Sequence, residues 1–304
     1  EHLVDGVEEG VALGARRPEF FGEVIGLLGE LVAMLVALGA GCWHEAPGRS
    51  SAPSAAHSRP RGNSGGIQVH RIAVEHIPQT GEIVAVEGEE AHHALRVKRL
   101  GVGADLEMLN GLGVVARGRI EGTEKLGKQG WRLTARVLTR EEIAPERPRL
   151  EVLASAPKGA RVEDMVDQLS QVGAAAWRPL LCARTEVEPR AGKMERLTRH
   201  ASEACKQCGR AWSLEVGEAV RFAEALVRPE GTALVLGHVS GEAYRATGKD
   251  VRLLIGPVGD FTAEELAQAR EAGAQVVNMG PHVMRIETAT LAAAAVILDQ
   301  ERRG

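Results

Sequence analysis

The sequence is poor in aromatic residues, and this scarcity excludes one common kind of nucleic-acid-binding surface. Among 304 residues there are four Phe, four Trp and one Tyr. A sheet that binds RNA by stacking bases on aromatic rings needs more of them, so such a sheet is not expected. Any contact with nucleic acid has to rely on charge and shape.

Cysteines, long apolar runs and an excess of charge are also missing. Four cysteines in a chain of this length do not form a disulfide scaffold, which favours a reducing compartment. No segment reaches about 20 uninterrupted apolar residues, so a multi-span membrane protein is excluded. The net charge of −4 excludes a polycationic tail protein but leaves room for a local basic surface. We expect a cytoplasmic protein.

Residues 1–68 differ in composition from the rest of the chain. The segment 46–66 is rich in Ser, Pro, Gly and Ala, and it cannot bury enough apolar surface to fold. The apolar run 24–40, with two arginines ahead of it and Cys42 behind it, has features of an export or lipoprotein signal. Acidic residues in and beside that run argue against a signal. We expect a flexible or non-native extension.

Two folded domains are predicted beyond the extension. Residues 69–145 contain several short apolar runs of the kind found in β-strands, and an Asn-Gly turn at 110–111 separates two of them. This pattern predicts a small β-rich domain. In residues 146–304, apolar runs alternate with helical segments, an order that predicts an α/β domain with a largely parallel sheet. A capping box from Thr262 to Glu265 marks the start of one helix.

Periodicity places several elements within these domains. Residues 89–99 and 192–208 are predicted to be helices. Three apolar runs, 233–237, 251–255 and 275–279, predict strands covered on both faces. The buried face of the second helix is expected to consist of residues at helical spacing, namely Met194, Leu197, Ala201, Ala204 and Cys208.

Three predicted strands end in glycine-bearing loops, at residues 236–238, 256–260 and 279–282. In a parallel sheet covered on both faces, ligands bind beyond the carboxyl ends of the strands. Glycine lets the backbone approach such a ligand closely. The pattern indicates a site for a nucleotide-like ligand, although tight turns between strands and helices would give the same pattern.

Basic residues gather along the helix 192–208 and its flanks. From Arg184 to Arg210 there are seven Lys or Arg and four Asp or Glu. Such a stripe suits the phosphate backbone of RNA, and it is equally typical of a solvated helix face. A second basic cluster, at residues 96–99, lies in the β-rich domain.

Metal and redox motifs are weak in this sequence. The Cys205-Lys-Gln-Cys208 segment is only half of a zinc site, so the two thiols are expected to lie in the core or near the surface without a metal. The pair His92-His93 has no third ligand at metal spacing, and we expect no metal site.

Several segments together resemble the RsmE family of ribosomal RNA methyltransferases. They are EACKQCGR at 203–210, LLIGPVGDFTAEEL at 253–266 and MGPHVMRIETATLAA at 279–293. The segment HHALRVKRLGVGADLEMLNGLG at 92–113 is similar to the N-terminal PUA-like module of that family, and PKGARVEDMVDQLSQVGA at 157–174 to its first catalytic-domain helix.

The resemblance implies a fold, a cofactor and a reaction. The fold is α/β, with a SPOUT-type trefoil-knot methyltransferase domain preceded by a small β-rich PUA-like domain. The reaction is methylation of N3 of a uridine in 16S ribosomal RNA, either as free RNA or in the small ribosomal subunit. The methyl donor is S-adenosyl-L-methionine. The enzyme is expected to be a homodimer that does not associate with a membrane. The residues carried over to the cofactor loops are Leu236, Gly237, Gly256, Pro257, Gly259, Met279, Gly280 and Met284.

The chemistry requires alignment of the nitrogen with the methyl group and loss of the N3 proton. Arg285 or Arg210 is expected to donate to the uracil oxygens, and Glu287 or Glu203 to act as the base. An acidic residue such as Glu287 is also favourable at a helix start for electrostatic reasons alone. RNA contacts are expected from Arg71, Arg96, Lys98, Arg99, Arg184 and Arg199.

Four positions depart from the family's usual pattern. Val258 stands in place of a glutamate, Asp260 in place of a glycine, His282 in place of an arginine and Ile286 in place of a threonine. The loss of a carboxylate and an arginine near the cofactor leaves an alternative function, that of a catalytically weak RNA-binding relative.

Overall fold

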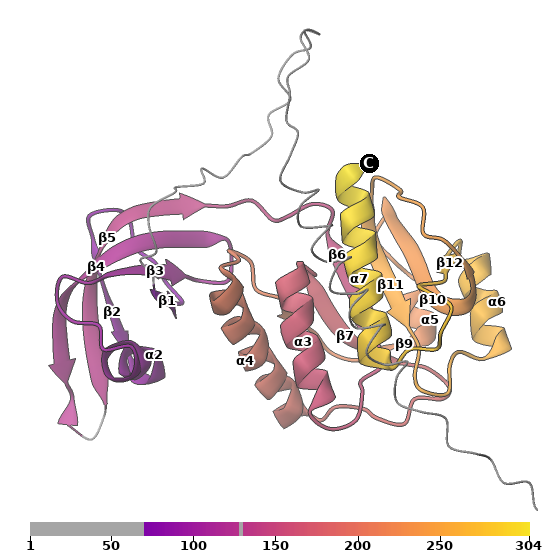
Figure 1. The fold of residues 1–304 in the computed structure, drawn as a ribbon, viewed down its shortest axis with the longest axis horizontal. Coiled ribbons are helices and arrows are strands. Elements are labelled where there is room, and N and C mark those ends of the chain that lie inside the picture. Colours follow the sequence, from indigo (N-terminus) through magenta and orange to yellow (C-terminus); the bar gives the residue numbers. More distant parts are fainter. Residues whose placement is uncertain (1–69, 128–129) are drawn as a thin grey trace, which may run out of the picture. The chain divides into compact units, whose positions relative to one another are not determined.

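The computed structural model of the protein describes residues 70–127 and 130–304 (Figure 1). The extension 1–68, including the apolar run with features of a signal, lies outside the described residues. Among the described helices, none combines the length and the apolar character that a membrane span needs. The described residues form two sheets, which follow one another along the chain.

The first sheet has five strands in the order β1-β3-β4-β5-β2. β1 pairs parallel with β3, and the other neighbours are antiparallel. The predicted hairpin at the Asn-Gly turn is confirmed, because the Oδ1 atom of Asn110 accepts hydrogen bonds from the amides of Leu112 and Val114. The strands are β1 (His70–Ala73), β2 (Ile83–Glu87), β3 (Asp105–Leu109), β4 (Val114–Lys125) and β5 (Trp131–Glu142).

The predicted helix 89–99 is only partly correct. An α-helix, α2 (Gly88–His92), continues as a π-helix, η1 (His93–Val97). The amide of Lys98 donates to the carbonyl of His93, and that of Leu100 donates to the carbonyl of Ala94, wider spacings than in an α-helix. Arg99 then takes the left-handed conformation and ends the segment.

The second sheet is parallel and has the order β12-β10-β11-β6-β7-β8, with β9 paired to β7. Because its strands are parallel, the chain crosses back over a face of the sheet between neighbouring strands. The strands are β6 (Leu150–Ala154), β7 (Ala176–Leu181), β8 (Glu215–Val216), β9 (Val220–Arg221), β10 (Thr232–Glu242), β11 (Asp250–Ile255) and β12 (Gln275–Val277).

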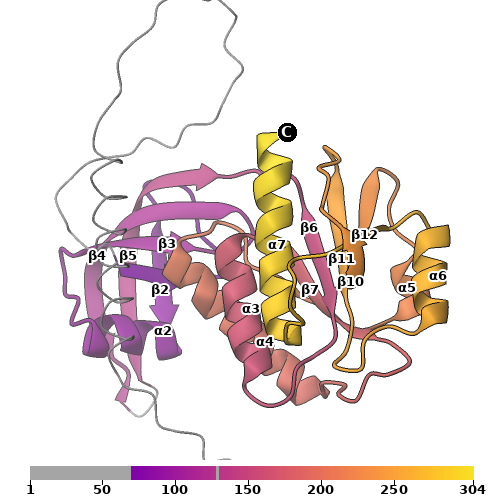
Figure 2. The same ribbon diagram turned by 45° about the vertical axis from the view of Figure 1, so that its right-hand side comes forward.

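Helices cover both faces of this sheet (Figure 2). One core cluster joins α3, α4 and α7 to residues such as Leu253 of β11, and the other joins α5 and α6 to Leu254 of the same strand. Because adjacent residues of a strand point to opposite faces, the two clusters pack against opposite faces of β11. The helices are α3 (Arg161–Val172), α4 (Ala191–Cys208), α5 (Phe222–Ala225), α6 (Ala263–Glu271) and α7 (Ile286–Arg303).

Two expectations about burial are wrong in detail. The run 275–279 is not a strand covered on both faces, because β12 lies at the sheet edge and only Val277 of that run is buried. In α4, Cys205 is buried and Cys208 is exposed, while Met194 is half-buried. The buried stripe ends at Cys205, whose thiol donates a hydrogen bond to the carbonyl of Arg210 at 3.0 Å. The predicted capping box at Thr262 is confirmed.

A buried carboxylate ties the end of α7 to the loop between β10 and β11. Glu301 accepts hydrogen bonds from Tyr244 Oη and from the amides of Thr247 and Gly248, the latter two at 2.8 Å. Burial raises the pKa of Glu301, but these hydrogen bonds outweigh it and hold the pKa below its ordinary value. The last helix is therefore anchored by an ionised group.

We expect Glu301→Gln to lower the free energy of unfolding at pH 7 by about 2–3 kcal/mol, because hydrogen bonds to a charged group stabilise by roughly 1.5–3 kcal/mol. Since the folded-state pKa is depressed, the contribution is complete above the ordinary glutamate pKa of about 4.3 and is lost as the pH falls through the folded-state value. Urea unfolding at several pH values measures both effects. The control is Asp299→Asn, which removes an exposed pair with Arg303 and should cost less than about 0.5 kcal/mol. A difference between Glu301→Gln and wild type that does not shrink on acidification contradicts this role.

Candidate active site

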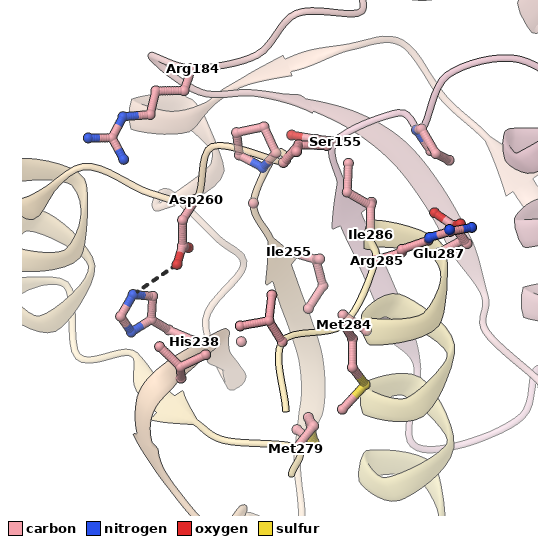
Figure 3. A pocket seen from close by; sticks show the side chains of 18 of the residues that line it. Ser155, Arg184, His238, Ile255, Asp260, Met279, Met284, Arg285, Ile286 and Glu287 are labelled. Atoms are coloured by element: carbon pink, nitrogen blue, oxygen red, sulfur yellow. Dashed lines mark ion pairs between the residues drawn. The ribbon is translucent and has the colours of Figure 1, made fainter. Parts of the chain in front are cut away.

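A cavity of about 540 Å³ lies at the carboxyl ends of the central parallel strands (Figure 3). Its walls come from the segments that follow β6, β11 and β12 and from residues 237–239 of β10. These segments meet because parallel neighbours in register end at the same edge of the sheet. The volume lies within the roughly 300–1,000 Å³ of small-molecule pockets.

Most of the residues expected to bind a cofactor line this cavity. Gly237, Gly256, Pro257, Met279, Gly280 and Met284 do so. Leu236 does not, because its side chain is buried on the face of the sheet covered by α5 and α6. Gly259 does not either, and it packs on the side chain of Arg184.

Glycine is favoured at two of these positions, for space at one and for backbone conformation at the other. A Cβ atom on Gly237 would lie 2.6 Å from Cδ1 of Ile255, on the neighbouring strand. Gly280 has a φ of +151°, which side chains rarely tolerate. At both positions the cavity wall is bare backbone, with no side chain between it and a ligand.

Two of the expected catalytic residues stand at the start of α7, on the cavity wall. Arg285 is the residue before the first turn, and Glu287 lies within that turn. Glu287 Oε1 accepts a hydrogen bond from Arg161 at 3.3 Å. Its Oε2 atom is buried and has no hydrogen-bond partner among the described residues. A buried carboxylate oxygen without a partner is able to accept a proton or a hydrogen bond from a ligand.

The other expected donor, Arg210, lies outside this cavity. Its guanidinium is buried and donates to the carbonyls of Ser170 and Ala174, at 2.8 and 2.9 Å. It therefore satisfies the carbonyls at the end of α3, as cations do at helix C-termini. The alternative base, Glu203, is exposed and paired with Lys206.

The residues expected to contact RNA are scattered. Arg71 holds β1 to α4, because it pairs with Glu107 at 2.5 Å and donates to the carbonyl of Gln207 at 3.2 Å. Arg184 lines the cavity and donates to the carbonyl of Gly259 at 2.6 Å. The others, namely Arg96, Lys98, Arg99 and Arg199, are exposed.

Sequence reasoning missed part of the cavity. The segment 155–158 after β6 lines it, as do Arg161, Thr185 and Asn278. The rule that ligands bind at carboxyl ends would have found 155–158, because β6 belongs to the same parallel sheet. Asn278 links two walls, since it donates to the carbonyl of Val239 at 2.9 Å and accepts from the amide of Gly280 at 2.8 Å.

The thiols and histidines do not form a metal site in the part of the chain that the structure describes. Burial raises the pKa of Cys205 to about 11, so its thiolate, the form that binds metals, is disfavoured. His92 and His93 are exposed. Cys205 lies in the core and Cys208 at the surface, as expected for core or near-surface thiols.

Comparison with known proteins places this geometry in a family. A model described as "RNA methyltransferase domain" matches residues 145–298, and one described as "RNA methyltransferase PUA domain" matches residues 86–128. The ribosomal RNA small subunit methyltransferase E of Mycobacterium bovis is 29% identical over 238 residues, which cover 74% of this chain and 89% of that protein.

Solved structures agree with this result. A putative methyltransferase from Legionella pneumophila, in complex with bound S-adenosylmethionine, is 26% identical with a TM-score of 0.67, covering 76% of this chain and 97% of that one. A probable rRNA methyltransferase from Porphyromonas gingivalis is 26% identical with a TM-score of 0.68, covering 77% and 99%. The first sheet is the PUA-like part, the parallel sheet is the methyltransferase part, and the chain belongs to the RsmE family of RNA methyltransferases.

Proposed function

We propose that this protein transfers a methyl group from S-adenosyl-L-methionine to N3 of a uridine in 16S ribosomal RNA. The observation that carries the proposal is the cavity at the carboxyl edge of the parallel sheet, with Arg285 and Glu287 together on its wall. The names of the relatives, which include a small-subunit rRNA methyltransferase and a structure with bound S-adenosylmethionine, support the substrate and the cofactor.

The residues of the cavity fit S-adenosyl-L-methionine. Ile255, Met279 and Met284 offer apolar surface, and Gly237 and Gly280 present bare backbone, which suits the edge of an adenine ring. When bound, this cofactor supplies a methyl group on a positively charged sulfur. Leu236 and Gly259 would act indirectly, Leu236 by anchoring β10 in the core and Gly259 by packing on Arg184.

We assign the proton-handling role to Glu287 and the donor role to Arg285. The free Oε2 atom of Glu287 can accept the N3 proton of the uracil, while Arg161 holds the other oxygen and orients the group. Arg285 is exposed at the same wall, where its guanidinium can donate to a uracil oxygen as negative charge develops. Arg210 takes no part, because carbonyls of α3 and its loop occupy it.

The remaining parts of the proposal rest on the family resemblance. The exposed residues Arg96, Lys98, Arg99 and Arg199 would contact RNA phosphates. The protein would act in the cytoplasm as a homodimer, with domains at 69–145 and 146–304. The trefoil knot also stays a prediction.

Gly280→Ala tests the cofactor site. The alanine needs an unfavourable φ and places a methyl group 3.5 Å from Cε of Met284, so the dissociation constant for S-adenosyl-L-methionine should rise about tenfold, or ~1.4 kcal/mol. The matched control is Gly231→Ala, which imposes a positive φ of +78° with no atom within 4 Å and does not line the cavity. Isothermal titration calorimetry compares the two. Equal affinities in both variants and the wild type would place the cofactor elsewhere.

Arg285→Ala and Glu287→Gln test the chemistry. Each should lower the rate of methyl transfer to small ribosomal subunits by about a hundredfold or more, the usual contribution of a general base or a charge-stabilising donor. Labelled cofactor gives the rate, and mass-spectrometric mapping gives the modified uridine. Arg303→Ala, at the exposed far end of α7, is the control. If the wild-type protein binds the cofactor but methylates no uridine, it is the catalytically weak RNA-binding relative. If a variant methylates at the wild-type rate, the substituted residue does not have the role assigned to it.

A further inference from the structure

The loop after β11 has an unusual backbone conformation at its last cavity residue. Asp260 has a φ of +60°, and in the described ranges only one other residue that is not glycine, Arg99, has a positive φ. Aspartate tolerates this conformation better than most residues, but glycine is favoured there. A side chain retained at such a position needs a compensating contact.

That contact comes from β10, on the other side of the cavity edge (Figure 3). Oδ2 of Asp260 lies 3.2 Å from Nε2 of His238, whose side chain is only 13% exposed. The amide of Ser240 donates to Nδ1 of His238 at 3.1 Å. Because an amide can only donate, Nδ1 is the acceptor and the ring proton lies on Nε2, facing the carboxylate.

The same loop is held at two further points. The other carboxylate oxygen of Asp260 accepts the amide of Phe261 at 2.8 Å. Arg184, from the segment after β7, donates to the carbonyl of Gly259 at 2.6 Å. The loop that carries cavity residues 256–258 is thus held at Gly259 and Asp260 by side chains from the segment after β7 and from β10.

We propose that His238 and Asp260 are positioning residues whose contact, here called the latch, joins β10 to the loop after β11. The latch holds cavity residues 256–258 in the conformation that binds the cofactor. This inference rests on the proposed function, because its consequence is affinity for S-adenosyl-L-methionine. The latch acts before the cofactor arrives: when it is broken, the loop spends less time in the competent conformation, and the apparent affinity falls by that fraction. The methyl-transfer step keeps its rate at saturating cofactor.

A double-variant cycle tests the latch. We expect His238→Ala and Asp260→Gly each to raise the dissociation constant and the KM for S-adenosyl-L-methionine about fivefold, with kcat unchanged. Asp260→Gly is well suited, because glycine adopts a φ of +60° without strain, and the loop loses only the carboxylate with its contacts to His238 and to the amide of Phe261. The double variant should bind no more weakly than either single variant. If the double variant instead raises the dissociation constant by the product of the two single effects, the latch is overturned, because each side chain then contacts the cofactor independently.

Hydrogen exchange in the cofactor-free full chain gives a second readout. The amides of residues 258–261 should exchange about fivefold faster in either single variant, because local opening of the loop becomes easier. The control is Glu242→Gln, which removes a fully exposed ion pair of similar length, 3.1 Å, from the same strand. Unchanged exchange in the single variants overturns the latch. A wild-type protein that binds no S-adenosyl-L-methionine overturns the proposed function, and hydrogen exchange then still decides whether the latch exists.

Discussion

The parallel pairing of β10 with β11 is the constraint on which the site depends. Leu236 lies opposite Leu254, and Gly237 lies opposite Ile255, so both strands reach the edge of the sheet at the same level. β6 pairs with the other side of β11 in the same way, with Ala154 opposite Ile255. Side chains and backbone from three separate parts of the chain therefore meet at one edge. A shift of one residue in either pairing would turn side chains to the opposite face of the sheet and disrupt the cavity wall.

Burial on both faces keeps that register. Leu254 packs toward α5 and α6, and Leu253 and Ile255 pack toward α3, α4 and α7. A strand that packs on both faces cannot shift its register without exposing apolar side chains, and burial of each such side chain stabilises the fold by about 1.5–3 kcal/mol. The core thus holds the strand ends still, while the loops beyond them, rich in glycine, supply the surface that meets the ligand.

Sequence reasoning found what depends on local patterns. Apolar runs predicted the parallel strands, the capping box predicted the start of α6, and glycines at strand ends predicted most of the cavity wall. Arg285 and Glu287 were expected from the family resemblance, and both line that wall because they follow directly on the glycine loop after β12. The family resemblance supplied the identity of the ligand, which no local pattern contains.

The remaining assignments could not be made from sequence because they depend on partners distant in the chain. Arg210 belongs to a basic stripe in the sequence, yet its partners are carbonyls of residues 170 and 174, at the end of another helix. Arg71 is likewise occupied at the contact between β1 and α4. In both cases the arginine donates to backbone carbonyls far away in the sequence, and its sequence neighbours carry no sign of that role. The contact of His238 with Asp260 likewise joins distant parts of the chain, strand β10 and the loop after β11.

In the function proposed above, the carboxyl edge of the parallel sheet holds the cofactor, with Arg285 and Glu287 at the reacting end. A crystal structure of the protein with S-adenosyl-L-methionine is the decisive test. We expect the adenine ring to lie against the glycine backbone of residues 237 and 280, and the methyl group to face the start of α7. A cofactor bound outside this cavity, or one whose methyl group points away from Arg285 and Glu287, would contradict it.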